Sequence, residues 1–208
     1  MINFFTPPGF SNRLTSPTGG LETRIHSEFE IVFLLIMNYT GTLLSPKCHW
    51  YCFLVPLVIL LFNIEHLVFG GLVGQARKTY GIPYPTMYAV PGTLRYYNDA
   101  MKPADSSFSE TITNEEAHAF NLVQRGHQNM IENAPFFLAI LLVAWSFPLY
   151  AGIAGLLYLV GRALYMYGYS KDVQSRYYGA FFIYPSLLTL FILSGMSMAH
   201  IVQGVEPY

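Results

Sequence analysis

Four long apolar segments constrain the fold of this chain more than any other feature of its sequence. Each reaches the roughly 20 residues that an α-helix needs to cross a bilayer. Only 11% of the 208 residues are charged, whereas soluble domains usually carry about 25%. The sequence therefore predicts an all-α integral membrane protein, a four-helix bundle over residues 50–203. Its spans run from Trp50 to Val73, from about Asn114 to Trp145, from about Tyr150 to Ser170 and from about Arg176 to Gln203.

The segments outside these spans have other compositions. Residues 1–49 form an N-terminal extension, in which the apolar stretch Phe29–Leu44 is interrupted by polar residues and falls short of a span. Residues 80–119 are polar and contain several prolines, which predicts a long loop. Residues 204–208 form a C-terminal tail.

Three local signals refine this organisation. Thr113 and Glu116 match a capping box, which predicts that the second spanning helix begins near Asn114. Pro185 predicts a kink or a lost backbone bond in the fourth helix. Lys and Arg gather in the loops after the first and third spans, which predicts that these loops are cytosolic and that both termini lie on the other side.

Charge and cysteine content argue against two classes of function. The net charge of −1 provides no basic field that could hold nucleic acid. Cys48 and Cys52 lack the second ligand pair of a structural zinc site. We therefore expect neither a nucleic-acid partner nor a metal.

The second span carries a polar face. Its members fall within about one third of the helix circumference, at about 100° per residue. An Arg or Glu deep in a bilayer costs roughly 2.5 to 3.5 kcal/mol, so such residues pair with each other or line a cavity. An internal Arg125–Glu132 pair that only joins helices is the simpler alternative, but it does not require the neighbouring amides. The polar residues are Asn121, Arg125, Gln128, Asn129 and Glu132.

The third span repeats the pattern with Tyr158, Arg162, Tyr165 and Tyr169. An interfacial aromatic belt would explain Tyr169 but not Arg162. Arg binds carboxylates as a bidentate fork, and a Tyr hydroxyl adds an orienting bond. With Glu132 accepting an ammonium group, these residues suit a small zwitterion with two carboxylates. Glutathione fits that description, as do other amino-acid-like ligands.

Two features of the first span predict packing roles. His66, next to Glu65, predicts a helix–helix hydrogen bond rather than a proton relay, because that helix has no second acid nearby. Gly70, Gly71 and Gly74 predict close helix packing rather than phosphate binding, because no Lys-Ser/Thr pair follows them.

Several linked motifs over about residues 50–203 resemble the membrane-associated proteins in eicosanoid and glutathione metabolism. The family motifs are Arg125-x-x-x-Asn129-x-x-Glu132-x-x-Pro135, then Gly161-Arg162-x-x-Tyr165-x-x-Gly168-Tyr169, and then Arg176. Three further motifs look most like the type 3 microsomal glutathione transferases: Ala76-Arg77-Lys78-x-Tyr80, Tyr84-Pro85-x-Met87-Tyr88 and Phe120-Asn121-x-x-Gln124-Arg125-x-His127-Gln128-Asn129.

The resemblance implies a homotrimer that binds its co-substrate glutathione between neighbouring chains, with no metal. It implies a transferase that joins glutathione to an apolar or lipid second substrate, with peroxidase or leukotriene C4 synthase-like activity as related possibilities. The implied compartment is the endoplasmic reticulum membrane, or alternatively the mitochondrial outer membrane. It assigns thiol activation to Arg176, whose cation would favour the thiolate. It assigns glutathione contacts to Arg77, Arg125, Asn129, Glu132, Arg162, Tyr165 and Tyr169.

The sequence also departs from the family pattern. Leu122 stands where a Cys often follows the Phe-Asn pair, and Asn133 replaces a Tyr of the leukotriene-conjugating branch. Two other functions remain alternatives. A non-catalytic lipid-binding scaffold could lose the activating cation, whereas this chain retains Arg176. A small transporter also has intramembrane charges, but four spans without a broken-helix repeat argue against it.

Overall fold

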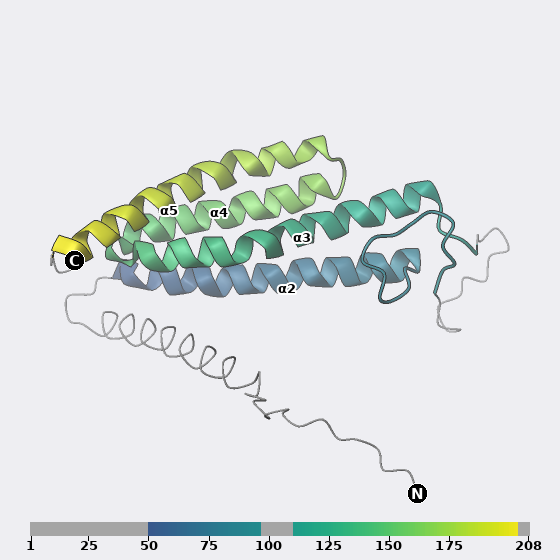
Figure 1. The fold of residues 1–208 in the computed structure, drawn as a ribbon, viewed down its shortest axis with the longest axis horizontal. Coiled ribbons are helices and arrows are strands. Elements are labelled where there is room, and N and C mark those ends of the chain that lie inside the picture. The colour runs from purple at the N-terminus through teal and green to yellow at the C-terminus, as the bar shows by residue number, and fades with distance from the viewer. Residues whose placement is uncertain (1–49, 97–109, 204–208) are drawn as a thin grey trace, which may run out of the picture. The chain divides into compact units, whose positions relative to one another are not determined.

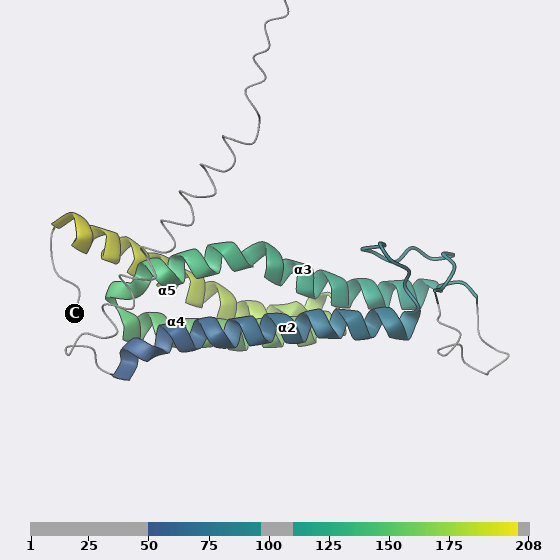
Figure 2. The same cartoon turned by 90° about the horizontal axis from the view of Figure 1, so that it is seen from below.

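The computed structural model describes residues 50–96 and 110–203, which contain four long helices (Figures 1 and 2). All four are long and apolar enough to cross a membrane, which confirms the predicted all-α four-span fold. The expectations for residues 1–49 and 204–208 lie outside the described residues. In chain order the elements are η1 (Trp50–Phe53), α2 (Leu54–Tyr80), α3 (Asn114–Val143), η3 (Ala144–Ser146), α4 (Pro148–Tyr169), η4 (Gln174–Arg176) and α5 (Tyr177–Gln203).

Local signals determine where the helices end. Helix α2 continues beyond Val73, because its polar last turns remain helical until Gly81 adopts the left-handed conformation at φ 63° and caps it. Helix α3 begins at Asn114, as the capping box predicts: the Glu116 backbone N–H donates to Thr113 Oγ1 over 3.3 Å, and the Thr113 N–H donates to Glu116 Oε2 over 2.9 Å. The capping box thus ends the loop before residue 119.

Helix α5 continues through Pro185 without interruption. Proline has no N–H, so it cannot donate to the Phe181 carbonyl one turn earlier, and the predicted loss of a backbone bond follows. On the next residue, Ser186 Oγ donates to the Phe182 carbonyl over 2.7 Å.

Small residues bring the helices close together. A Cβ added at Gly155 would lie 2.7 Å from Val58 Cγ1, and one at Gly152 would lie 2.4 Å from Leu54 Cβ, so α4 packs directly on α2. By contrast, Gly71 and Gly74 have no neighbour within 4 Å. The prediction that these two glycines support close packing is therefore wrong within the described part of one subunit, because they face away from its other helices.

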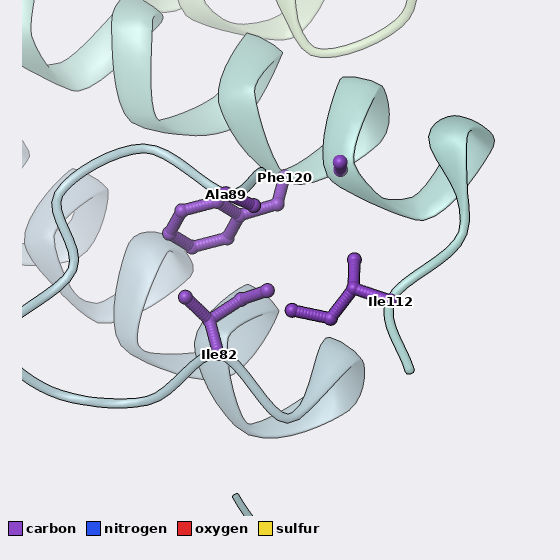
Figure 3. Packing of buried hydrophobic residues seen from close by; sticks show 5 residues of the cluster. Ile82, Ala89, Ile112 and Phe120 are labelled. Carbon is purple, nitrogen blue, oxygen red and sulfur yellow. The ribbon is translucent and has the colours of Figure 1, made fainter. Parts of the chain in front are cut away.

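The described part of the long loop is fixed against the first turns of α3. Ile82, Ala89 and Ile112 bury their side chains with Phe120 (Figure 3). Asn121 holds the same loop, because its side chain accepts from the Ala89 N–H over 2.7 Å and donates to the Ala89 carbonyl over 3.0 Å. This loop therefore packs against the α2–α3 end of the bundle.

The closest approach of α4 and α5 generates the first prediction. A Cβ at Gly179 would lie 2.3 Å from the Tyr165 backbone N and 2.4 Å from the Gly161 carbonyl O. Because backbone atoms cannot move aside as a side chain can, Gly179→Ala should separate the two helices and cost about 1 to 3 kcal/mol of stability. The thermal unfolding midpoint of the detergent-solubilised protein measures this loss.

Gly195→Ala provides the matched control on the same helix, since a Cβ there meets nothing within 4 Å. It should leave the unfolding midpoint unchanged or raise it slightly, because Ala favours a helix over Gly. Equal midpoints for the two variants would contradict a direct backbone contact at Gly179.

Candidate functional site

A buried arginine joins two of the spanning helices. Arg162 on α4 is only 2% exposed, and its Nη1 donates to Asn129 Oδ1 on α3 over 2.8 Å. The two residues were predicted separately from the polar faces of their helices, and the structure brings them into direct contact. Their bond fixes the register of α3 against α4.

A continuous row of contacts leads from Arg162 to the start of α5. The Arg162 Cζ lies 5.3 Å from the Tyr165 ring centroid, and the Tyr165 and Tyr169 rings lie 5.6 Å apart. The Arg176 Cζ then lies 5.7 Å from the Tyr169 ring centroid. Spacings of three and four residues place the first three of these side chains on one face of α4.

The turn between α4 and α5 brings Arg176 to this row. The Gly168 carbonyl accepts from the N–H groups of both Lys171 and Asp172 at 3.0 Å. A Cβ at Gly168 would lie 2.3 Å from the Ser175 carbonyl O, so the chain folds back against a glycine that has no side chain. Because of this tight turn, Arg176 in η4 lies beside Tyr169, although seven positions separate them in the sequence.

The second pair of predicted site residues lies on the surface of α3. Arg125 Nη1 lies 3.0 Å from Glu132 Oε1, and the two side chains are 45% and 44% exposed in a single subunit. The simpler alternative, a pair that only joins helices, does not hold within one subunit, because both partners belong to α3. Its exposed half can meet a ligand or another subunit.

Arg77 lies apart from the other predicted residues. Its guanidinium donates to the Pro83 carbonyl over 3.3 Å and lies over the rings of Tyr84 and Phe120, at 4.5 and 5.2 Å from their centroids. None of these described contacts reaches another predicted glutathione residue. Asn121, which shares the polar face of α3, holds the loop at Ala89 instead of facing the Arg162 row.

An apolar cavity of about 410 Å³ lies among α2, α3 and α4. Its walls include Leu72 from α2, Val123 from α3 and Met166 from α4, with Tyr167 and Ser170 at the end of α4. None of the eight predicted site residues lines it. The cavity therefore suits an apolar group, whereas the Arg162 row suits a polar one.

Glu65 is a further charged residue inside the bundle, beyond Arg125, Glu132 and Arg162, and its sequence pattern did not assign it to the site. Both carboxylate oxygens of Glu65 on α2 are buried and accept no hydrogen bond within the described ranges. The carboxylate lies within electrostatic range of Arg162. The available signal was an acid in the middle of an apolar span, which we assigned only as the neighbour of His66.

The predicted helix–helix hydrogen bond of His66 is not found among the described residues. Its buried Nδ1 has no hydrogen-bond partner there. The ring instead packs against the ring of His127 on α3, with 5.4 Å between the centroids. Ring packing between α2 and α3 therefore takes the place of the expected bond.

Comparison with known protein families matches residues 55–196, from the start of α2 to within α5, to the MAPEG family. This chain belongs to the MAPEG family. It is 35% identical to human microsomal glutathione S-transferase 2 over 149 residues, which are 71% of this chain and 83% of that protein. It is also 30% identical to the uncharacterized protein sll1147 of Synechocystis over 152 residues, which are 71% of this chain and 88% of that protein.

These relatives confirm the predicted family. The human relative is a type 2 protein, so the finer resemblance to the type 3 transferases stays a prediction. Together with the four spanning helices, membership shows that this MAPEG protein is an integral membrane protein.

Proposed function

We propose that this MAPEG protein is a membrane-bound glutathione transferase. The observation that carries the proposal is the row of contacts from Asn129 through Arg162, Tyr165 and Tyr169 to Arg176. In this row the phenols of Tyr165 and Tyr169 lie between two cations, Arg162 and Arg176. The 35% identity to a human protein named as a microsomal glutathione S-transferase supports the same assignment.

Glutathione has two carboxylates, one ammonium group and one thiol, and the site residues match these groups. Arg125 and Arg162 offer the guanidinium donors that bind carboxylates. Glu132 offers an acceptor for the ammonium group. Asn129, Tyr165 and Tyr169 add polar atoms that orient the tripeptide, and Arg77 supplies a further cation at the end of α2.

The exposed Arg125–Glu132 pair supports a homotrimer as the functional form. A charged pair that is 45% and 44% exposed within a spanning helix would face lipid in an isolated subunit, at considerable cost. A neighbouring chain removes that cost and closes the glutathione site against the pair. In this arrangement glutathione lies between subunits at the cytosolic side of the membrane.

Arg176 activates the thiol in the proposed reaction. A thiol has a pKa near 8.5, and an adjacent cation lowers that pKa by stabilising the thiolate. The thiol proton passes to solvent, and the thiolate sulfur forms a bond to the electrophilic carbon of an apolar substrate. In a substitution, a leaving group such as chloride departs with the electrons of its bond to that carbon. In an addition to an activated double bond, the electrons of that bond take up a proton from solvent. With a lipid hydroperoxide, two glutathione molecules are instead oxidised to the disulfide while the hydroperoxide is reduced to an alcohol and water.

The apolar cavity among α2, α3 and α4 accommodates part of the second substrate in this proposal. Its walls are mainly carbon, and α4 contributes Ala163, Met166 and Tyr167 to them. An apolar electrophile dissolved in the membrane therefore has a binding surface on a different face of α4 from the row. The endoplasmic reticulum is the proposed compartment, with the mitochondrial outer membrane as the alternative.

The direct test of this function is an assay of the purified protein with glutathione and 1-chloro-2,4-dinitrobenzene as the apolar electrophile. We expect the conjugate to form well above the rate of the same mixture without protein. A parallel assay with a fatty-acid hydroperoxide measures the peroxidase reaction. The absence of both activities from protein that binds glutathione would favour a lipid-binding scaffold.

Replacement of Glu132 separates glutathione binding from chemistry. Glu132→Gln removes the carboxylate that pairs with the ammonium group, so we expect affinity for glutathione to fall by roughly 1.5 to 3 kcal/mol, the range for a hydrogen bond to a charged group. The rate at saturating glutathione should change much less. Calorimetric titration measures the affinity, and unchanged affinity would show that Glu132 serves only its pair with Arg125.

Replacement of Arg176 tests the activation of the thiol. In Arg176→Ala the pKa of bound glutathione should rise toward about 8.5, because the adjacent cation is gone. Less thiolate then exists at neutral pH, so turnover should fall more than affinity and should recover partly as the pH rises. The ultraviolet absorbance of the bound thiolate against pH measures this change directly.

Lys171→Ala is a matched control, because Lys171 is a cation of the same turn that contacts Tyr167, which is not part of the row. It should leave the thiolate titration unchanged. If Arg176→Ala also titrates like the parent, Arg176 only anchors the helix end, and Tyr169 or Lys78 becomes the candidate for activation.

A further inference from the structure

The packing of α2 on α4 determines which residues face each other farther along the two helices. Leu54 meets Gly152 and Val58 meets Gly155, so the contacts advance in the same direction and the helices are parallel. Glu65 lies seven residues after Val58, and Arg162 lies seven residues after Gly155. Seven residues are nearly two full helical turns, which return a side chain to within about 20° of the same face. The register therefore places Glu65 opposite Arg162.

The burial of these groups agrees with that register. The Glu65 carboxylate oxygens, the Arg162 Nε and the Tyr158 hydroxyl are all buried, and none has a hydrogen-bond partner in the described part of the chain. The Arg162 Cζ lies 5.9 Å from the Tyr158 ring centroid. Three polar groups from two helices thus share one region inside the bundle.

The only hydrogen bond described for Arg162 goes to the neutral amide of Asn129. A neutral acceptor does not compensate a buried cation, and an uncompensated charge inside a membrane bundle is costly. Glu65 is the carboxylate that faces this cation from α2. The Glu132 carboxylate lies one helical turn beyond Asn129 on α3 and is already paired with Arg125.

We propose that Glu65 is a positioning residue that acts through Arg162 on the glutathione site. Its negative charge holds the Arg162 guanidinium between α2 and α3, where Nη1 donates to Asn129. Without that charge, the guanidinium turns toward Glu132 and competes with the ammonium group of glutathione. The inference rests on the proposed function, since it names a determinant of the same site.

Glutathione affinity tests this role. Glu65→Gln keeps the size of the side chain and removes its charge, so we expect the dissociation constant for glutathione to rise about tenfold, within the range of coupling between neighbouring groups. Glu65→Asp keeps the charge and should restore most of the affinity. The rate at saturating glutathione should change little in either variant. Asn63→Ala is the control, because Asn63 is exposed on α2 and its side-chain amide donates to the Ile59 carbonyl of its own helix.

A double-mutant cycle shows whether Glu65 acts through Arg162. In an Arg162→Gln background, Glu65→Gln should cause no further loss of glutathione affinity, because the cation it compensates is absent. Losses that add independently would overturn the inference, as would an unchanged affinity in Glu65→Gln alone.

Thermal unfolding of the same variants tests the interaction between Glu65 and Arg162 without any need for glutathione binding. If the parent protein binds no glutathione, the proposed function fails and the unfolding midpoints decide whether the two charges interact. Glu65→Gln should then lower the midpoint in the parent and change it little in the Arg162→Gln background. Additive decreases in the midpoint would show that Glu65 and Arg162 are independent.

Discussion

The burial of one cation determines much of the arrangement of this protein. Arg162 is 2% exposed inside a bundle of spanning helices, where a charge without partners would be unfavourable. It is held by Asn129 on α3 and faces Glu65 on α2, so three helices contribute to one polar centre. Tyr165 and Tyr169 extend that centre toward the end of α4. The tyrosines of the candidate site therefore continue the polar contacts of the buried Arg162 side chain toward the end of α4.

Glycine contacts make this arrangement possible. Helix α4 touches α2 through Gly152 and Gly155, and it touches α5 through Gly161 and Gly179. A helix with small residues on two sides packs closely against both neighbours. Its Arg162 side chain also reaches α3, where it donates to Asn129. At the end of α4, Gly168 has no side chain that would block the tight turn into η4, and this turn brings Arg176 beside Tyr169. Packing and the candidate chemistry therefore depend on the same helix.

Helical periodicity and capping account for what could be predicted from the sequence. The apolar lengths predicted the four spans, Thr113 and Glu116 predicted the start of α3, and the spacing of Arg162, Tyr165 and Tyr169 predicted their shared face. Contacts between helices were harder to predict, because periodicity gives the face of each helix but not its register against another. The place of Glu65 was missed for that reason: its position relative to Arg162 on α4 depends on the register that the Leu54–Gly152 and Val58–Gly155 contacts give the two helices. Asn121 was placed on the polar face correctly, but its bonds to Ala89 depend on the path of a loop that has no periodicity.

The charged residues of the candidate site differ in how far they are buried within one subunit. Arg162 is buried within one subunit and donates to Asn129, whereas the Arg125–Glu132 pair remains almost half exposed. The buried hydrogen bond between Arg162 and Asn129 joins α3 to α4 and is strengthened by the low dielectric around it. Because almost half of each side chain of the Arg125–Glu132 pair is exposed in one subunit, a ligand or a neighbouring subunit can reach both charges. In the proposed site, glutathione replaces this pair with its own ammonium and carboxylate groups, while the Arg162–Asn129 bond keeps the helices in place. Binding then requires the rearrangement of two surface side chains and leaves the packing of the four helices intact.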